Sequence, residues 1–300
     1  MTAARRASLQ PPCERLIALL ESLQRFVETH ERLVVITGAG VSTSSGIGDY
    51  RDAQGQWKRA PPIQHDAFVK SAAVRKRYWA RSFHGWRSFV KAQPNAAHHA
   101  LATPVLQSRI SGLITQNVDR LHQAAGQNNV VDLHGRLDRV ICMSCERYTA
   151  RADLQDRLAL ENAWLDSAVF TPAPDGDADL LISPEVISKV CVPACQTCGG
   201  FLKPDVVFYG DSVPRPVVDA AYAMVDAGDG VLIVGTSLMV FSSFRFCRRA
   251  HQRGIPMVAI NDGKTRADDL LSEKIAARCE AILPALAAAL RPICLQSAAP

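Results

Sequence analysis

The sequence lacks the features of a membrane or secreted protein. No apolar stretch reaches the ~20 residues of a membrane-spanning helix, and residues 1–12 have no apolar core of the kind found in secretory signals. The chain also has no long run of one charge and no internal repeat, and its net charge of +5 is spread along its length. We therefore expect neither a membrane nor a nucleic acid as a partner. The 48% apolar and 21% charged residues are ordinary for a globular protein of 300 residues.

A disulfide framework is also absent. The nine cysteines are odd in number and scattered, which argues against full pairing and fits a reducing compartment. Four of them form two C-x-x-C pairs, and two such turns complete a tetrahedral Zn²⁺ site, which with four thiolates is closed and structural. A redox role is the alternative for either pair alone. Cys191 is a competing ligand, but the spacing favours Cys142, Cys145, Cys195 and Cys198.

Short apolar runs alternate with segments of helical spacing through most of the chain. Several runs are almost continuously apolar, as expected for strands covered on both faces. The pattern predicts an α/β fold, a doubly wound parallel Rossmann-like sheet with a smaller inserted domain that is helical and zinc-binding. Strands are predicted at 32–36, 112–115, 130–133, 206–208, 231–234 and 257–260, and helices at 14–30, 97–106, 216–227, 242–253 and 268–277. The Rossmann-like domain would span 14–53, 95–141 and 201–292, and the small domain would combine 54–94 with 142–200.

A glycine-rich segment, residues 37–51, follows the first predicted strand. Glycines at such a turn let backbone N–H groups approach a phosphate, and the next helix N-terminus favours negative charge. The segment does not fit the dehydrogenase fingerprint, because Thr43 occupies the third glycine position and no acidic residue ends a second strand to hold a ribose. Hydride transfer is therefore disfavoured, and a purely structural strand–turn–helix corner is the alternative.

Polar residues follow other predicted strands, at the edge where open α/β sheets bind ligands. Asn117 and Asp119 offer an amide and a carboxylate to a carboxamide or a ribose, with helix capping as the alternative. His134 is placed to act as a general base near neutral pH, with a structural histidine as the alternative. Two further turns offer groups to an adenosine or are ordinary turns: Gly235, Thr236 and Ser237, and Asn261, Asp262 and Gly263.

Taken in chain order, these motifs resemble those of the sirtuins over about residues 16–290. The resemblance implies NAD-dependent removal of acyl groups from lysine, with NAD and a structural Zn²⁺ as cofactors. His134 would activate a ribose hydroxyl as the catalytic base, and Asn117, also a catalytic residue, would hold the nicotinamide ribose and carboxamide together with Asp119. The implied cofactor-binding residues are Gly38, Ala39, Gly40, Ser42, Asp49, Tyr50, Arg51, Gln116, Asn117, Asp119, Gly235, Thr236, Ser237, Asn261, Asp262, Gly263 and Cys279.

The resemblance also concerns the substrate, an acylated-lysine protein. It favours the class II branch of the family and an acyl group that is glutaryl-like, lipoyl or acetyl. Tyr78 and Arg81 would share a helix face and resemble a pair that binds carboxylated acyl groups, or else Arg81 is a solvated charge. Sirtuins usually have proline at the position of Gly48. A glycine there would make the cofactor loop more flexible than a proline would. The substrate backbone would pair, as an added strand, with Val206, Val207, Phe208 and Tyr209.

Two other functions fit parts of the sequence. A protein ADP-ribosyltransferase on the same scaffold would transfer ADP-ribose without depending on His134. A zinc-containing nucleic-acid or protein-binding module with a degenerate nucleotide fold would release no nicotinamide, but the even scatter of Lys and Arg argues against it. We expect a monomer in the cytoplasm of a bacterium, with the mitochondrial matrix as the alternative.

Overall fold

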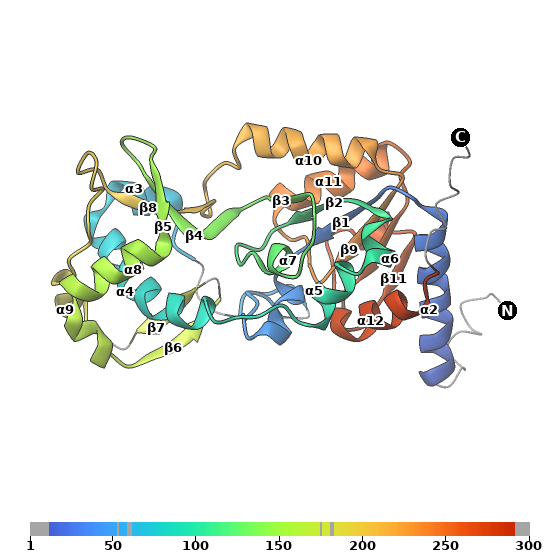
Figure 1. Cartoon of the computed structure of the whole chain (residues 1–300), viewed down its shortest axis with the longest axis horizontal. Helices are drawn as coiled ribbons and strands as arrows, with labels where there is room; N and C mark the ends of the chain where they lie inside the picture. Colours follow the sequence, from blue (N-terminus) through green and yellow to red (C-terminus); the bar gives the residue numbers. More distant parts are fainter. Residues whose placement is uncertain (1–11, 53, 59–61, 175, 181–182, 292–300) are drawn as a thin grey trace, which may run out of the picture.

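The protein consists of two modules that lie side by side (Figure 1). The computed structural model describes residues 12–52, 54–58, 62–174, 176–180 and 183–291. The larger module is built on a six-stranded parallel sheet with the strand order β11-β10-β9-β1-β2-β3. The strands are β1 Leu33–Thr37, β2 Ile110–Thr115, β3 Val130–Asp132, β9 Gly230–Val234, β10 Met257–Ile260 and β11 Glu273–Ile275. The predicted α/β class with a parallel sheet is confirmed.

The order of the strands determines where a ligand can bind. The sheet grows outward from β1 through β2 and β3 on one side, and through β9, β10 and β11 on the other. Thr37 at the end of β1 pairs with Thr115 of β2 and with Val234 of β9. The gap beyond the carboxyl ends of β1 and β9 is therefore the topological switch point, where open α/β sheets form their binding crevice.

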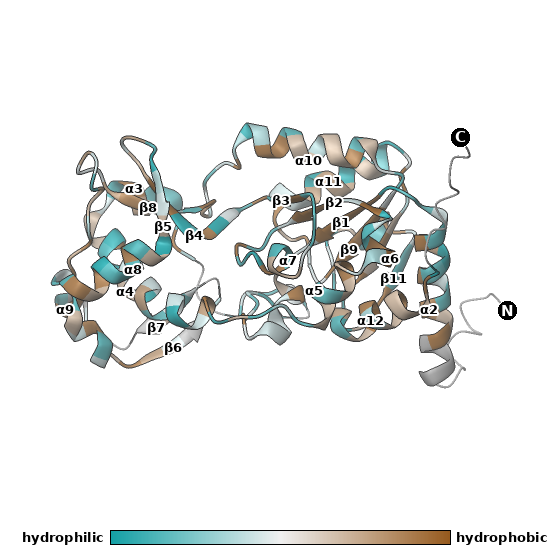
Figure 2. Ribbon diagram, in the orientation of Figure 1, coloured by the Kyte–Doolittle hydropathy of each residue, from teal (hydrophilic) through white to brown (hydrophobic). Residues whose placement is uncertain are grey.

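Helices cover both faces of this sheet because successive strand side chains point to opposite sides. Leu33 and Val35 pack into one buried cluster with residues of α2, α5 and α12, whereas Val34 and Ile36 pack with α10 and α11 on the other face. Figure 2 shows the hydrophobic strands lying between these helices. The helices of this module are α2 Pro12–Thr29, α5 Ala96–Leu101, α6 Pro104–Gln107, α7 Leu121–Ala124, α10 Arg215–Ala227, α11 Phe241–Gln252 and α12 Cys279–Ala289. Short 3₁₀ turns are η1 Ala39–Val41, η2 Thr43–Ser45 and η4 Asp268–Leu270.

The smaller module has its own sheet and its own core. Its three strands run antiparallel in the order β5-β4-β8, and a separate two-stranded hairpin joins β6 to β7. The long helix α4 begins after Ser71, whose side chain accepts a hydrogen bond from the Val74 amide. It buries Trp79 and Phe83 among the other aromatic and aliphatic residues of this core. The elements are β4 Gly135–Cys142, β5 Tyr148–Ala150, β6 Phe170–Ala173, β7 Asp177–Leu180, β8 Leu202–Val206, α3 His65–Lys70, α4 Ala72–Phe89, α8 Arg151–Glu161, η3 Ala163–Ser167 and α9 Pro184–Ser188.

Two predicted elements are wrong. The spacing of residues 268–277 predicts a helix, but only a 3₁₀ turn forms before β11, whose Glu273 and Ile275 pair with Val258 and Ile260. The apolar spacing of so short a segment fits either structure, and the open edge of β10 favours the strand. The apolar run at residues 206–208 predicts a strand of the parallel sheet, but β8 ends at Val206 and pairs antiparallel with β4. An apolar run does not show which strand it will pair with.

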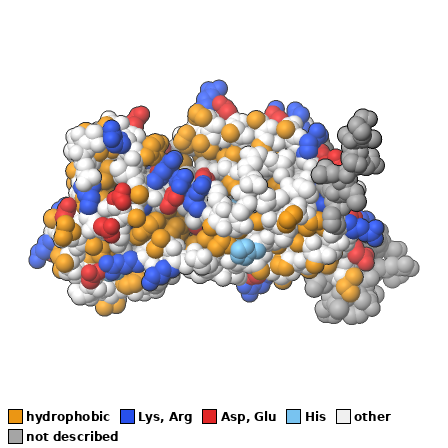
Figure 3. Space-filling view, in the orientation of Figure 1, with side chains coloured by type: hydrophobic (Ala, Val, Ile, Leu, Met, Phe, Trp, Pro, Cys, Tyr) orange, Lys and Arg blue, Asp and Glu red, His pale blue; other side chains and the backbone are white. Residues whose placement is uncertain are grey.

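Among the described residues, no helix combines the length and the apolar character that crossing a membrane requires. On the face drawn in Figure 3, basic and acidic side chains are interspersed, and several of them lie where the two modules meet.

Candidate active site

A cleft of about 1330 Å³ runs from the switch point of the sheet to the smaller module. It gathers most of the predicted site residues, although they are far apart in the sequence. Gly38, Ser42, Asp119 and Arg81 do not line it, but hydrogen bonds and an ion pair connect them to the lining residues Asn117 and Asp177. The predicted residues that do line it are Ala39, Gly40, Asp49, Tyr50, Arg51, Tyr78, Gln116, Asn117, His134, Val206, Val207, Phe208, Tyr209, Gly235, Thr236, Ser237, Asn261, Asp262, Gly263 and Cys279.

The glycine-rich turn is held against the end of β9. The Gly40 amide donates a hydrogen bond to the Gly235 carbonyl at 2.9 Å. A Cβ on Gly40 would lie 2.7 Å from that same carbonyl oxygen, and one on Gly38 would lie 2.8 Å from Thr236 Cβ. Only glycine therefore permits this approach of the two backbones. The result is a narrow backbone-lined floor at the switch point, the kind of surface that phosphate groups approach.

A buried polar network lies directly behind this floor. The Ser42 hydroxyl donates to the Asp119 carboxylate at 2.6 Å and accepts from the Asn117 side-chain amide at 3.0 Å. Asn117 also donates to the Gly38 carbonyl at 3.1 Å. Burial raises the pKa of Asp119, against the opposing effect of its hydrogen bond from Ser42. Asp119 also accepts from the Leu121 amide, the first of α7, at 2.9 Å, so it connects the start of this helix to Ser42.

His134 lies in the wall of the cleft with a defined hydrogen-bond partner on each nitrogen. Its Nδ1 is 3.1 Å from the Gln116 carbonyl oxygen and its Nε2 is 2.8 Å from the Ser242 hydroxyl. A carbonyl can only accept, so Nδ1 carries the proton of the neutral ring and Nε2 is left as the acceptor. Burial lowers the pKa of His134 to about 4, with the Gln116 hydrogen bond opposing it. At neutral pH the ring is therefore neutral, with its proton on Nδ1 and a basic lone pair on Nε2.

The sequence did not predict Ser242, the hydrogen-bond partner of His134 Nε2. The only signal was its place near the start of a predicted helix, and its contact with His134 joins residues 108 positions apart. Gln116 belongs to the same network, because its side chain donates to Thr236 Oγ1 at 2.7 Å and accepts from Ser243 at 3.0 Å. The amide of Gln116 thus ties the ends of β2 and β9 to the start of α11.

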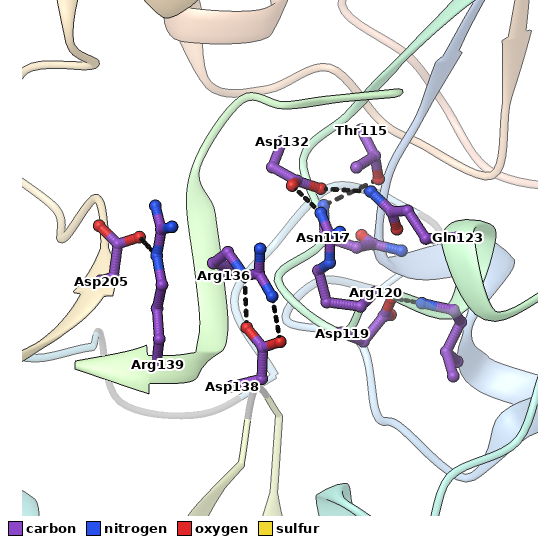
Figure 4. Close-up of polar contacts among 11 residues, drawn as sticks. Thr115, Asn117, Asp119, Arg120, Gln123, Asp132, Arg136, Asp138, Arg139 and Asp205 are labelled. Carbon is purple, nitrogen blue, oxygen red and sulfur yellow. Dashed lines mark hydrogen bonds and ion pairs between the residues drawn. The ribbon is translucent and has the colours of Figure 1, made fainter. Parts of the chain in front are cut away.

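Ion pairs lie along the segment from β3 to β4, which connects the two modules and contains His134. Figure 4 shows these pairs. Arg120 pairs with Asp132 beside the end of β3, and Gln123 donates to the same carboxylate at 2.9 Å. Further along this segment, Arg136 pairs with Asp138 within β4, and Arg139 pairs with Asp205 of β8. Burial raises the pKa of Asp132, although hydrogen bonds and the nearby arginines act in the opposite direction.

The predicted cofactor loop after η2 folds back on itself, with Arg51 bridged to Trp57, and Asp49, Tyr50 and Arg51 line the cleft. The Arg51 guanidinium lies 4.0 Å from the centre of the Trp57 ring and donates to the Gly55 carbonyl at 2.7 Å. The ring centroids of Trp57 and Tyr209 are 5.4 Å apart, which connects this loop to the predicted substrate segment. A Cβ on Gly48 would lie 3.7 Å from Pro174 of the hairpin, an ordinary contact, so the space there admits a side chain.

The predicted substrate segment leaves β8 beside His134, since the Val207 amide donates to the His134 carbonyl at 2.9 Å. Tyr78 lies behind it, with its ring centroid 5.4 Å from that of Phe208. Arg81 adopts an arrangement that neither prediction for it foresaw. It is neither a solvated charge nor directed into the cleft, but forms a two-point ion pair with Asp177 of the hairpin, at 3.0 and 2.7 Å.

The four predicted metal ligands converge in the smaller module, with all their sulfur atoms within 4.8 Å of one another. A tetrahedron with Zn–S bonds of about 2.3 Å has sulfurs about 3.8 Å apart. The Cys142–Cys198 and Cys145–Cys195 sulfurs are 3.5 and 3.8 Å apart, so the set fits Zn²⁺. Cys191 lies outside this cluster, and its sulfur faces the Lys189 carbonyl.

The fold and the cleft together define a nucleotide-binding α/β enzyme that carries a separate metal module with four cysteine ligands. The family model described as the Sir2 family matches residues 38–242, and the chain belongs to that family. The predicted resemblance to sirtuins is therefore confirmed at the level of the family.

Two curated bacterial proteins are similar over most of the chain. NAD-dependent protein deacetylase 2 of Bradyrhizobium diazoefficiens is 56% identical over 264 residues, which cover 88% of this chain and 96% of that protein. The NAD-dependent protein deacetylase of Bordetella bronchiseptica is 52% identical over 264 residues, with the same coverage of 88% and 96%. Among solved structures, a complex of Sir2 with a p53 peptide and NAD⁺ has a TM-score of 0.72 at 25% identity, covering 89% of this chain and 96% of that one.

Proposed function

We propose that this sirtuin is an NAD-dependent protein-lysine deacylase that moves an acyl group from lysine to ADP-ribose and releases nicotinamide. The observation that carries the proposal is His134, a neutral base with a defined tautomer in the wall of a cleft that also contains Asn117 and the glycine turn. The similar bacterial proteins, named NAD-dependent protein deacetylases, support the same activity and cofactor. A solved Sir2 complex with NAD⁺ and a peptide supports the class of substrate.

Different residues of the cleft would bind the cofactor and transfer the proton. When bound, NAD would supply the ADP-ribose acceptor and the nicotinamide leaving group. The floor formed by Gly40 and Gly235 would receive its phosphates, and Ser237 with Asn261 would lie along its adenosine half. His134 Nε2 would take a proton from a ribose hydroxyl, for which the Ser242 hydroxyl must first give up its place.

The cysteine cluster would have no part in the reaction. Four thiolates fill a tetrahedral Zn²⁺ site and leave no position for a reacting water, so its role would be to hold the smaller module together. Membership of the class II branch is supported by the motif at residues 49–51 and the run at residues 203–210.

The test is release of nicotinamide from NAD with acetyl-, glutaryl- and lipoyl-lysine peptides. We expect release that depends on the acyl peptide and falls by at least 100-fold in His134→Ala. The matched control is His251→Ala, which removes an exposed histidine from the end of α11 and should leave the rate unchanged. ADP-ribose attached to a protein acceptor at an undiminished rate in His134→Ala would instead favour the ADP-ribosyltransferase. No release from any peptide, by a folded protein that binds NAD, would contradict the proposal.

A further inference from the structure

The cleft continues past His134 into the smaller module, where its character changes. We call this part the acyl end, and its lining residues are Tyr78, Leu137, Pro174, Asp177 and Phe208. Tyr78, Leu137 and Asp177 belong to the smaller module, and Phe208 belongs to the predicted substrate segment. On the proposed deacylase function, a lysine arm entering beside Val207 would place its acyl group here. Four of these five residues are apolar or aromatic, and Asp177 contributes a carboxylate.

Asp177 is held by an arginine in a two-point ion pair. Arg81 Nε donates to Asp177 Oδ1 at 3.0 Å and Nη2 donates to Oδ2 at 2.7 Å, while Nε also lies 2.9 Å from the Ala178 carbonyl. The side chains of Arg81 and Asp177 are only 20% and 28% exposed. Planar pairing of this kind is the strongest form of a carboxylate–guanidinium contact. The carboxylate lines the cleft, whereas the guanidinium lies behind it.

The backbone around this pair is tightly packed, so the position of Asp177 is well defined. Gly85 lies one turn after Arg81 on α4, and a Cβ there would be 2.2 Å from the Gly176 carbonyl oxygen and 2.4 Å from that of Asp177. On the other side, a Cβ on Gly176 would be 2.4 Å from Leu137 Cδ2. The hairpin thus packs closely between α4 and the start of β4. This packing opposes a movement of the whole hairpin that would carry Asp177 away from Arg81.

We infer that Asp177 determines acyl specificity: its carboxylate occupies Arg81, so that the acyl end accepts neutral acyl groups and rejects those that end in a carboxylate. A glutaryl carboxylate could reach Arg81 only by displacing Asp177, which would leave a second, half-buried carboxylate beside the first. Such like-charge placement is strongly unfavourable in a partly desolvated site. An acetyl or butyryl group carries no charge that would pair with Arg81, and it would contact the apolar and aromatic residues of the acyl end.

The test compares kcat/KM for acetyl-, butyryl- and glutaryl-lysine forms of one peptide. For the native enzyme we expect both neutral peptides to exceed the glutaryl peptide by at least tenfold. Asp177→Asn keeps the size of the side chain but removes the charge of the carboxylate that forms the two-point pair with Arg81, so the ratio of glutaryl to acetyl kcat/KM should rise at least tenfold. Adding Arg81→Gln to Asp177→Asn should return the ratio to its native value, because the cation is then gone as well.

The matched control is Asp226→Asn, which breaks a two-point pair of the same geometry with Arg249, at 2.7 and 2.9 Å, outside the cleft. It should leave the acyl ratio unchanged. A native enzyme that prefers the glutaryl peptide, or a folded Asp177→Asn enzyme with an unaltered ratio, would overturn the role of Asp177 while leaving the deacylase function in place. The acyl preference of the native enzyme is measured without any variant, so the inference can be overturned even if Asp177→Asn folds poorly.

Discussion

Lowering the pH from 7 to 5 should weaken the fold through two enclosed histidines, His98 and His122. Their side chains are 0% and 1% exposed, and their ring centroids lie 4.8 Å apart. His122 Nε2 is 2.9 Å from the Thr37 hydroxyl, whereas its Nδ1 is buried without a hydrogen-bond partner among the described residues. Burial, with a smaller effect from a neighbouring histidine, lowers the pKa of His98 to about 4 and the pKa of His122 to about 3.

The sign and size follow from proton linkage. An unfolded histidine titrates near pH 6.5, so between pH 7 and 5 the unfolded chain takes up protons that the folded chain does not. The free energy of unfolding therefore falls as the pH falls, by about 2 kcal/mol for each ring over this range. The two rings together amount to about 4 kcal/mol, a large share of the roughly 5–15 kcal/mol that stabilises a typical domain. The loss should continue until the folded-state pKa values are reached.

Urea unfolding at pH 7, 6 and 5, at constant zinc, measures this effect. His122→Asn removes one titrating ring, so its loss of stability between pH 7 and 5 should be smaller than the native loss by about 2 kcal/mol. Asp119, whose pKa is raised by burial, has the opposite sign, but it cancels when the two proteins are compared. His251→Asn, at an exposed site, should leave the native pH slope unchanged. Equal slopes for the native protein and His122→Asn would refute the reasoning.

Three further predictions concern the metal, the glycine turn and the base. Removing zinc with a chelator should unfold the smaller module and abolish activity, and the loss of near-ultraviolet circular dichroism should be reversed by added Zn²⁺. Gly40→Ala should destabilise the fold by about 1–3 kcal/mol and weaken NAD binding at least tenfold in calorimetry, because its Cβ would lie 2.7 Å from the Gly235 oxygen. The kcat/KM should stay level from pH 8 to about 5.5 and then fall as His134, whose pKa is about 4, becomes protonated and ceases to be a base. A rate that already halves near pH 6.5 would show that burial does not control this histidine.

The errors made from the sequence share one physical cause. Residues 268–277 have apolar spacing that suits a helix, but the open edge of β10 recruits residues 273–275 as a parallel strand. Residues 206–208 have a strand-like composition, yet β8 finds its partner in β4 and runs antiparallel to it. In both segments the local signal is short, and pairing with a distant strand decides the outcome.

Local chemistry was sufficient for much of the candidate site. The two C-x-x-C turns bring their own ligands together, and the glycine turn after β1 reflects the close approach of two backbones. Parallel strands also place their carboxyl ends at one edge, so the alternation of strands and helices predicted that Asn117 and His134 would lie at the ligand-binding edge of the sheet, and both line the cleft.

The sequence by itself therefore determined five strands of the parallel sheet, the four metal ligands and the place of His134 at a strand end, because each depends on residue type and short spacing. Only the tertiary structure decided which groups those residues face. The Ser242 hydroxyl on His134 and the Asp177 carboxylate on Arg81 join positions 108 and 96 residues apart. Such contacts arise when separately folded modules pack together, and nothing in the spacing of either partner records the other. That packing places hydrogen-bond partners on both nitrogens of His134, which defines its tautomer, and it pairs Arg81 with the Asp177 carboxylate.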